Sequence, residues 1–144
     1  MIYALDTNII SFLLRPSKNP KVIEQFEKCI GQGDDYVIPP LSYYEISWYL
    51  LWKKAPAQSR LLDRLCENAV ANLQMGEADF ATAAQIKAHL TERGTPIGEK
   101  DGDIFIAAYC LVNDYTLVTD NTKDFDRIDG LKLANWKSWI AKKI

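Results

Sequence analysis

The sequence predicts an α/β protein in which a parallel sheet is flanked by helices. Short apolar runs alternate along the chain with longer segments whose apolar residues recur at helical spacing. Strands that alternate with helices form β–α–β units, and the right-handed crossovers of such units leave the strands parallel. The 144 residues are enough for one domain, and no repeat, linker or low-complexity tract divides them. We therefore expect a single domain over residues 1–144.

The N-terminal part of the chain predicts two strands and two helices. Residues 2–5 form an apolar run that stops at Asp6, which is typical of a buried strand followed by a turn. The apolar residues of 9–14 then begin a helix. A second helix is expected over 20–30, where a proline occupies the first helical position and glycines follow the end. Residues 36–38 are predicted to be the second strand.

The middle of the chain is predicted to be helical. One helix should begin at Ser42, because its spacing from Glu45 matches a capping box, in which each side chain hydrogen-bonds the other residue's backbone. Beyond a proline, apolar residues at helical spacing predict a second helix over 58–73. A third helix is expected over 77–93, since a glycine follows it at the position that favours left-handed backbone. Residues 101–113 are predicted to be the fourth.

The C-terminal part predicts two further strands. Residues 116–119 are rich in β-branched side chains and are predicted to be a strand, and the polar, turn-rich stretch 120–130 follows them. Residues 131–133 are expected to form the last, edge strand of the sheet. We expect Trp136 and Trp139 to pack near the C-terminus.

Composition excludes several classes of protein. The net charge of −2 argues against a sequence-specific DNA-binding protein, although a nuclease can bind phosphate through a metal ion. A single histidine, His89, makes a zinc site or a Ser-His-Asp triad improbable, and we expect it to be a surface residue. Cys29, Cys66 and Cys110 lack metal-ligand spacing and are expected to be buried thiols. No apolar run is long enough to cross a membrane and no signal peptide is visible, so we expect a cytoplasmic protein.

Acidic and amide side chains stand where a parallel sheet places its ligand site. Asp6 ends the first strand, Asp120 and Asn121 follow the strand 116–119, and Glu45 and Asp103 lie near helix starts. Ligands of open α/β sheets bind outside the carboxyl ends of the strands. Carboxylates that converge there repel one another unless a cation lies between them. Carboxylate oxygens without histidine or cysteine select Mg²⁺ or Mn²⁺, which suit phosphoryl chemistry.

Each of these residues also has a purely structural explanation. Asp6 can cap the following helix, and the capping box accounts for Glu45. Asp103 can be an ordinary acidic residue at a helix N-terminus. Asp120 and Asn121 can simply form a turn after a strand. Their joint placement at strand ends favours a functional site over four independent structural roles.

The same residues lie in four segments that resemble the motifs of PIN domains, and in particular of the VapC toxins of bacterial toxin–antitoxin pairs. The order and spacing of these segments extend through nearly the whole chain. The resemblance implies a three-layer fold with a roughly five-stranded parallel sheet. It also implies a Mg²⁺- or Mn²⁺-dependent endoribonuclease, usually a homodimer, that is inhibited by a small antitoxin protein. The matching segments are Leu5–Asn8, Leu41–Glu45, Asp103–Ala108 and Leu117–Phe125.

The resemblance also implies roles for individual residues. Asp6 and Asp103 match the principal metal ligands, and Glu45 matches the third acid of the site. Asn121 occupies the fourth position, where the family often carries aspartate; Asp120 could substitute for it. The hydroxyls matching the family at positions 7 and 119 could hold metal-bound water or a neighbouring carboxylate. In the implied reaction a metal-bound water attacks the RNA phosphodiester, and Glu45 orients or deprotonates that water.

Two alternatives to a ribonuclease remain open on the sequence. Another Mg²⁺-dependent phosphoryl hydrolase, such as a haloacid-dehalogenase-like phosphatase, would need a second acid two residues after Asp6, but Asn8 occupies that position. A non-catalytic PIN module that acts through protein contacts is favoured slightly by Asn121. The intact acids Asp6, Glu45 and Asp103 oppose it.

Two surfaces are candidates for binding. Lys53, Lys54, Arg60 and Arg64 could hold the RNA backbone, or they could form an ordinary solvated helix face. Three bulky aromatic residues, Trp48, Tyr49 and Trp52, cannot all face one core from a single helix. We expect at least one tryptophan to pack in the core. We expect the rest of this surface to receive an antitoxin helix or a second subunit.

Overall fold

The computed structural model describes residues 1–97, 101–138 and 140–142. The helices of these segments are too short or too polar to cross a lipid bilayer. The strands are β1 (Ile2–Leu5), β2 (Asp35–Val37), β3 (Thr116–Val118), β4 (Lys132–Asn135) and β5 (Ile140–Lys142). The helices are α1 (Thr7–Leu13), α2 (Pro20–Gly31), α3 (Pro40–Lys53), α4 (Pro56–Glu67), α5 (Glu77–Glu92), α6 (Gly102–Asn113) and α7 (Thr122–Phe125).

The strands form one sheet in the order β2-β1-β3-β4-β5. β1 to β4 are parallel, as expected, whereas β5 runs antiparallel to β4. The strand predicted near 131–133 is present as β4, but its expected position at the edge of the sheet is wrong, because β5 covers the outer edge of β4. The chain turns back directly after β4, where Asn135 Oδ1 accepts hydrogen bonds from the backbone N–H groups of Lys137 (2.9 Å) and Ser138 (3.3 Å). Trp136 is buried, as expected, and Trp139 lies outside the described residues.

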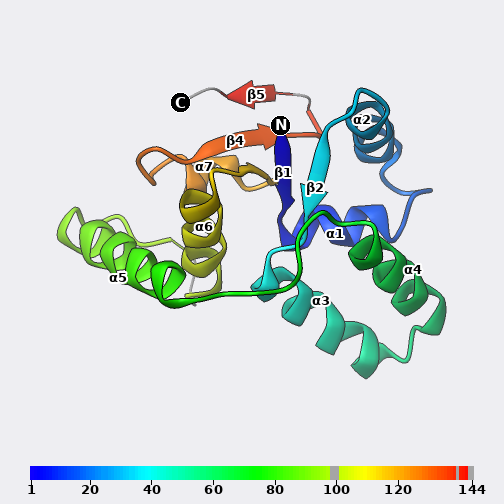
Figure 1. Ribbon diagram of the computed structural model, residues 1–144, viewed down its shortest axis with the longest axis horizontal. Helices are drawn as coiled ribbons and strands as arrows, with labels where there is room; N and C mark the ends of the chain where they lie inside the picture. The colour runs from blue at the N-terminus through cyan, green and yellow to red at the C-terminus, as the bar shows by residue number, and fades with distance from the viewer. Residues whose placement is uncertain (98–100, 139, 143–144) are drawn as a thin grey trace.

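Helices cover both faces of the sheet, so the expected three-layer architecture is confirmed. Figure 1 shows α5 and α6 on one side of the strands and α1 to α4 on the other. Each face of the sheet has its own hydrophobic core. Consecutive residues of a strand point into these two cores alternately, because side chains alternate across a pleated strand. Ala4 and Leu117 pack against α5 and α6, whereas Leu5 and Val118 pack against α1 to α4.

The topology places two strand ends side by side at a reversal in strand order. From β1 the chain moves outward to β2, and it then passes through α3 to α6 and returns to β3 on the other side of β1 (Figure 1). The backbone N–H of Asp6 donates to the carbonyl of Val118 (2.9 Å), so the carboxyl ends of β1 and β3 adjoin. Such a reversal is where open α/β sheets bind ligands.

Two predicted helix boundaries are wrong. α3 begins at Pro40 instead of Ser42, since proline suits a first helical position that needs no N–H donor. α4 covers Pro56–Glu67 instead of 58–73, because its Asn68 side chain hydrogen-bonds the carbonyl of Arg64 (3.0 Å) and ends the helix. The N–H of Val70 then donates to the carbonyl of Tyr36 (3.0 Å), which draws the chain back across β2.

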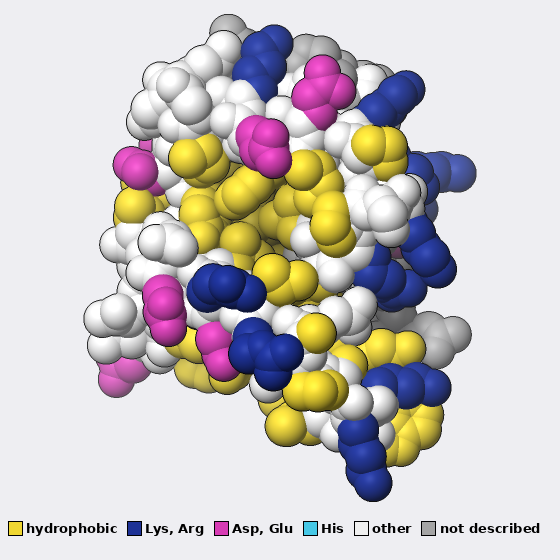
Figure 2. Space-filling view, turned by 90° about the vertical axis from the view of Figure 1, so that its right-hand side faces the viewer, with side chains coloured by type: hydrophobic (Ala, Val, Ile, Leu, Met, Phe, Trp, Pro, Cys, Tyr) yellow, Lys and Arg dark blue, Asp and Glu magenta, His cyan; other side chains and the backbone are white. Residues whose placement is uncertain are grey.

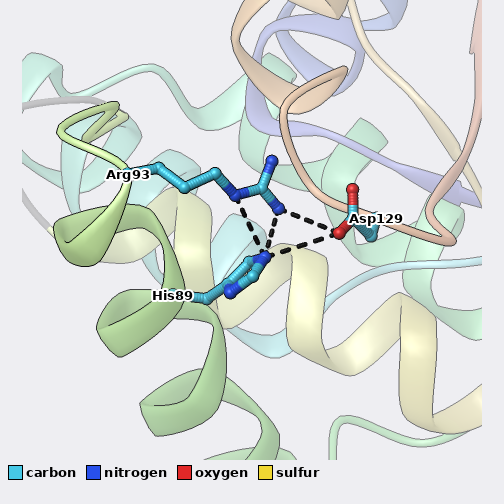
Figure 3. A network of polar contacts seen from close by, with 3 residues as sticks. All are labelled: His89, Arg93 and Asp129. Atoms are coloured by element: carbon cyan, nitrogen blue, oxygen red, sulfur yellow. Dashed lines mark hydrogen bonds and ion pairs between the residues drawn. The ribbon is translucent and has the colours of Figure 1, made fainter.

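His89 is an exposed residue of α5, as the sequence predicted. Arg93, one turn later, donates from Nε to His89 Nε2 (3.0 Å) and from Nη2 to Asp129 Oδ2 (2.9 Å) (Figure 3). The network joins the end of α5 to the loop before β4. Because both side chains are exposed, the ion pair of Arg93 and Asp129 contributes at most about 1 kcal/mol to the free energy of unfolding. Of the three free thiols, Cys29 and Cys110 are buried as expected, and Cys66 is half-buried.

Candidate active site

An open cleft of about 440 Å³ lies at the carboxyl ends of β1 and β3. It is lined by four of the residues that the sequence marked as a site: Asp6, Glu45, Asp103 and Asn121. They come from the turn after β1, from α3, from the first turn of α6 and from the turn after β3. The fold therefore brings together side chains that are far apart in the sequence. Asp120 points elsewhere, since its carboxylate lies 3.6 Å from the ammonium of Lys137.

Asp6 is buried at the base of the cleft and is held on both oxygens. Oδ1 accepts from the backbone N–H of Thr7 (2.8 Å), and Oδ2 accepts from the hydroxyl of Thr119 (2.6 Å). Burial raises the pKa of Asp6 from 3.8 to about 6, and the charges of Asp103 and Glu45 add to this rise. The two hydrogen bonds lower the pKa but do not cancel the effect of burial. Asp6 is thus a positioned carboxylate that would be stabilised by a nearby cation.

Glu45 belongs to the site and not to a helix cap. It lies in the second turn of α3, so the predicted capping box is wrong, and Ser42 is buried inside the helix with its hydroxyl unpaired. Glu45 Oε1 instead accepts a hydrogen bond from the hydroxyl of Thr7 (2.5 Å). The expectation that positions 7 and 119 hold neighbouring carboxylates is therefore confirmed. Gly102 approaches from the other side, where a Cβ would lie 3.2 Å from Glu45 Oε2.

Asp103 completes a group of like charges. Its pKa is raised by burial, by the charge of Glu45 and by the charge of Asp124. Within the described residues, no three carboxylates are close enough to form a ready-made metal cage. Asp6, Glu45 and Asp103 all present oxygen donors to the cleft, which are the ligands that hard divalent cations take in proteins.

Asp124 is a residue of this region to which sequence reasoning assigned no role. It lies on α7, and its Oδ2 accepts a hydrogen bond from the side-chain N–H of Asn121 (3.0 Å). The signal was present in the sequence, because residues three apart in a helical turn share a face. Asn121 is itself anchored, since its backbone N–H donates to the Thr119 hydroxyl (3.0 Å). Asn121 thus lines the cleft together with Asp103 while its side-chain N–H is bound to Asp124.

We expect Asn121→Asp to tighten divalent-metal binding several-fold, because it adds a negative charge to the cleft that Asp6 and Asp103 line. The substitution also removes the donor to Asp124 and adds a like charge, so the metal-free protein should become less stable at neutral pH. Calorimetric Mg²⁺ titration and thermal unfolding with and without the ion measure both effects. Asp120→Asn is the matched control and should leave metal affinity unchanged. The reverse pattern would assign the fourth position to Asp120.

The predicted basic group does not form one surface. Lys53 lines a small hollow next to the cleft, whereas Arg64 lines a separate groove. Arg15, which the sequence analysis did not select, lines both the cleft and the small hollow. The expectation that one tryptophan of α3 packs in the core is wrong, since Trp48 is 50% exposed and Trp52 is 65% exposed.

Comparisons with known proteins agree with the sequence motifs. The family described as PIN domain matches residues 3–131, which include all four site segments. Ribonuclease VapC1 of Haemophilus influenzae (strain R2866) is 30% identical over 136 residues, which are 94% of this chain and 98% of that relative. The tRNA(fMet)-specific endonuclease VapC of Shigella flexneri is 28% identical over 137 residues, which are 93% of this chain and 97% of that relative.

Solved structures show the same architecture. VapBC2 from Rickettsia felis, bound to a DNA fragment from its promoter, contains a chain that superposes with a TM-score of 0.81 at 25% identity. The match covers 94% of this chain and 99% of that one. A chain of VapBC-1 from nontypeable Haemophilus influenzae superposes with a TM-score of 0.75 at 27% identity and covers 94% and 98%. The similarity therefore extends over nearly the full length of each partner.

Proposed function

The chain belongs to the PIN-domain family, and from this premise we propose that it is a metal-dependent endoribonuclease, the toxin of a toxin–antitoxin pair. The observation that carries the proposal is the cleft in which Asp6, Glu45 and Asp103 converge at the reversal in strand order. Relatives of nearly equal length are named as ribonucleases and as a tRNA endonuclease. These relatives act on RNA, and an acidic cleft suits metal-assisted cleavage of a phosphodiester, so we infer that the substrate is RNA.

We propose that Asp6 and Asp103 hold Mg²⁺ or Mn²⁺ and that Glu45 orients or deprotonates the attacking water. When bound, the ion would offset the negative charge of the phosphate and lower the pKa of water. Thr119 and the backbone of Thr7 hold the Asp6 carboxylate in one orientation. The Thr7 hydroxyl aligns Glu45, which leaves its second oxygen to accept a proton from water.

Incubation with RNA in Mn²⁺, in Mg²⁺ or in EDTA tests the proposal. We expect internal cleavage with either ion and none in EDTA. A phosphatase would instead release inorganic phosphate from small monoesters, and a non-catalytic PIN module would do neither. Either result would overturn the assignment.

We propose that the antitoxin binds a groove formed by α1, α2 and α4. The groove has a volume of about 720 Å³, and Figure 2 shows hydrophobic side chains in its floor with acidic and basic residues on its rim. A helix with one apolar face would bury its apolar residues there. The related structures are toxin–antitoxin complexes, which supports an antitoxin partner, and the contact expected at Trp48 and Trp52 stays a second prediction. Its apolar lining includes Leu13, Ile23, Phe26, Ile30, Leu61 and Leu65.

Leu61→Asp should abolish inhibition by the antitoxin while RNA cleavage persists, because it places a charge in the groove and away from the acids. The test co-expresses the protein with its cognate antitoxin and measures copurification and the residual ribonuclease activity of the complex. Leu51→Asp is the matched control, since Leu51 is exposed on α3. Equal inhibition of both variants would contradict the groove assignment. The homodimer implied by the family resemblance stays a prediction, which light scattering would test.

A further inference from the structure

A second hollow of about 140 Å³ lies next to the acidic cleft. The linings of the cleft and the hollow share Ser11, Arg15, Ile46 and Tyr49, so the two adjoin, and we call them together the track. Among the described residues that line the second hollow, none is acidic, and Arg15 and Lys53 are cations. The track therefore changes from negative at the site to positive beyond it.

Three aromatic side chains of α3 form what we call the aromatic cluster: Trp48 and Tyr49, which border the track, and Trp52, whose ring packs against both. Trp48 and Tyr49 line the cleft itself, one turn beyond Glu45. The ring centroids of the cluster are 6.0 to 6.2 Å apart, so the three rings support one another on the surface. Large aromatic groups that stay exposed in a folded protein commonly mark a binding surface.

The two cations are placed beside these rings. The Lys53 ammonium lies 4.6 Å from the centroid of the Trp52 ring and 5.9 Å from that of Tyr49. Arg15 donates to the Ser11 hydroxyl (3.1 Å), and no carboxylate among the described residues is in ion-pair range of its guanidinium. Its remaining N–H groups are available to a phosphate.

We propose that this track binds the unpaired nucleotides next to the cleaved bond, with a base stacked on the ring of Trp48, the nearly perpendicular ring of Tyr49 beside it, and phosphates held by Arg15 and Lys53. The inference rests on the proposed ribonuclease function and adds the side chains that hold the RNA next to the acids. Base-paired RNA hides its ring faces, so a stacking surface selects splayed bases. The occupant is RNA and not a second copy of the chain, because the rings line the cleft that must admit the substrate.

Binding is best measured in the Asp103→Asn background with Mg²⁺, where RNA is not consumed. The probe is a short, unstructured oligoribonucleotide with a fluorescent label, and its annealed duplex is the comparison. Trp48→Leu should weaken single-strand binding about tenfold, and Trp48→Phe should restore most of it, because base–aromatic stacking depends on the ring face. Tyr44→Leu is the matched control, since Tyr44 is an exposed aromatic of α3 outside the track lining. Duplex binding should be weaker and indifferent to Trp48.

The cations have their own signature. Arg15→Gln and Lys53→Gln should each lower the salt dependence of single-strand binding by about one released counterion. With the catalytic acids intact, Trp48→Leu should raise KM and leave kcat nearly unchanged, as loss of uniform binding does.

Two outcomes would overturn the inference. One is equal single-strand affinity of Trp48→Leu and its parent. The other is conversion of a dimer to a monomer by Trp48→Leu with RNA affinity unchanged, which would make the aromatic cluster an interface between copies. Failure of the proposed function looks different. In that case the chain with intact acids cuts no RNA in Mn²⁺, whether or not Trp48 contributes to binding.

Discussion

Replacing Asp103 with asparagine should reduce the rate of metal-dependent RNA cleavage about a thousandfold or more. Losses of this size are typical when one member of a group of cooperating catalytic residues is removed. Asparagine keeps the shape of the side chain but removes one of the two charges proposed to hold the ion. The fold should persist, because the substitution relieves repulsion from Glu45 and Asp124. Single-turnover cleavage of a short RNA in Mg²⁺ and in Mn²⁺ measures the loss, and circular dichroism monitors the fold.

The chain offers a matched control two residues away. Asp101 stands at the N-terminus of α6, and its carboxylate is paired with the exposed ammonium of Lys87 (2.9 Å). Asp101→Asn removes the same charge from the same helix end without touching the cleft, so its cleavage rate should stay close to that of the wild type. Wild-type cleavage by Asp103→Asn at saturating RNA would exclude Asp103 from the metal site.

Asp6→Asn should stabilise the metal-free protein at neutral pH. The pKa of Asp6 is about 6 in the folded state and about 3.8 in the unfolded chain, so ionised Asp6 costs roughly 3 kcal/mol at neutral pH. Between pH 3.8 and about pH 6 the carboxyl group of Asp6 is protonated in the folded state and ionised in the unfolded chain. Wild-type stability should therefore fall as pH rises from about 3.8 to about 6 and stay level above. Asparagine does not titrate, so the free energy of unfolding of the variant should rise above that of the wild type by about 1–3 kcal/mol as pH increases through this range. Any weakening of the hydrogen bonds to Thr7 and Thr119 would reduce this gain.

Urea unfolding of both proteins in EDTA at pH 4, 5, 6 and 7.5 would show the divergence. Saturating Mg²⁺ should then restore wild-type stability at pH 7.5 and should do much less for Asp6→Asn, since the ion binds only the folded wild type well. A constant difference between the two proteins across this pH range would contradict the raised pKa. An equal response to Mg²⁺ would place the metal away from Asp6.

The sequence by itself determined the order of the elements and the candidate acids. Residues 2–5 form an apolar run, residues 116–119 are rich in β-branched side chains, and turn residues follow both, so the signals that mark them act within a few residues. A parallel sheet places the ends of such segments at one edge, so the convergence of Asp6 and Asp103 with either Asp120 or Asn121 could be predicted without coordinates.

Only the tertiary structure decided which partner each side chain takes. Glu45 has a local partner in the capping box pattern, but it instead accepts from Thr7, 38 residues away in sequence. The pairing of Asp120 with Lys137 leaves Asn121 as the residue that lines the cleft. The direction of β5 and the exposure of Trp48 likewise depend on how distant segments pack. Local patterns specify which conformations a segment can adopt, whereas hydrogen-bond partners and burial depend on distances between segments that only the folded chain establishes.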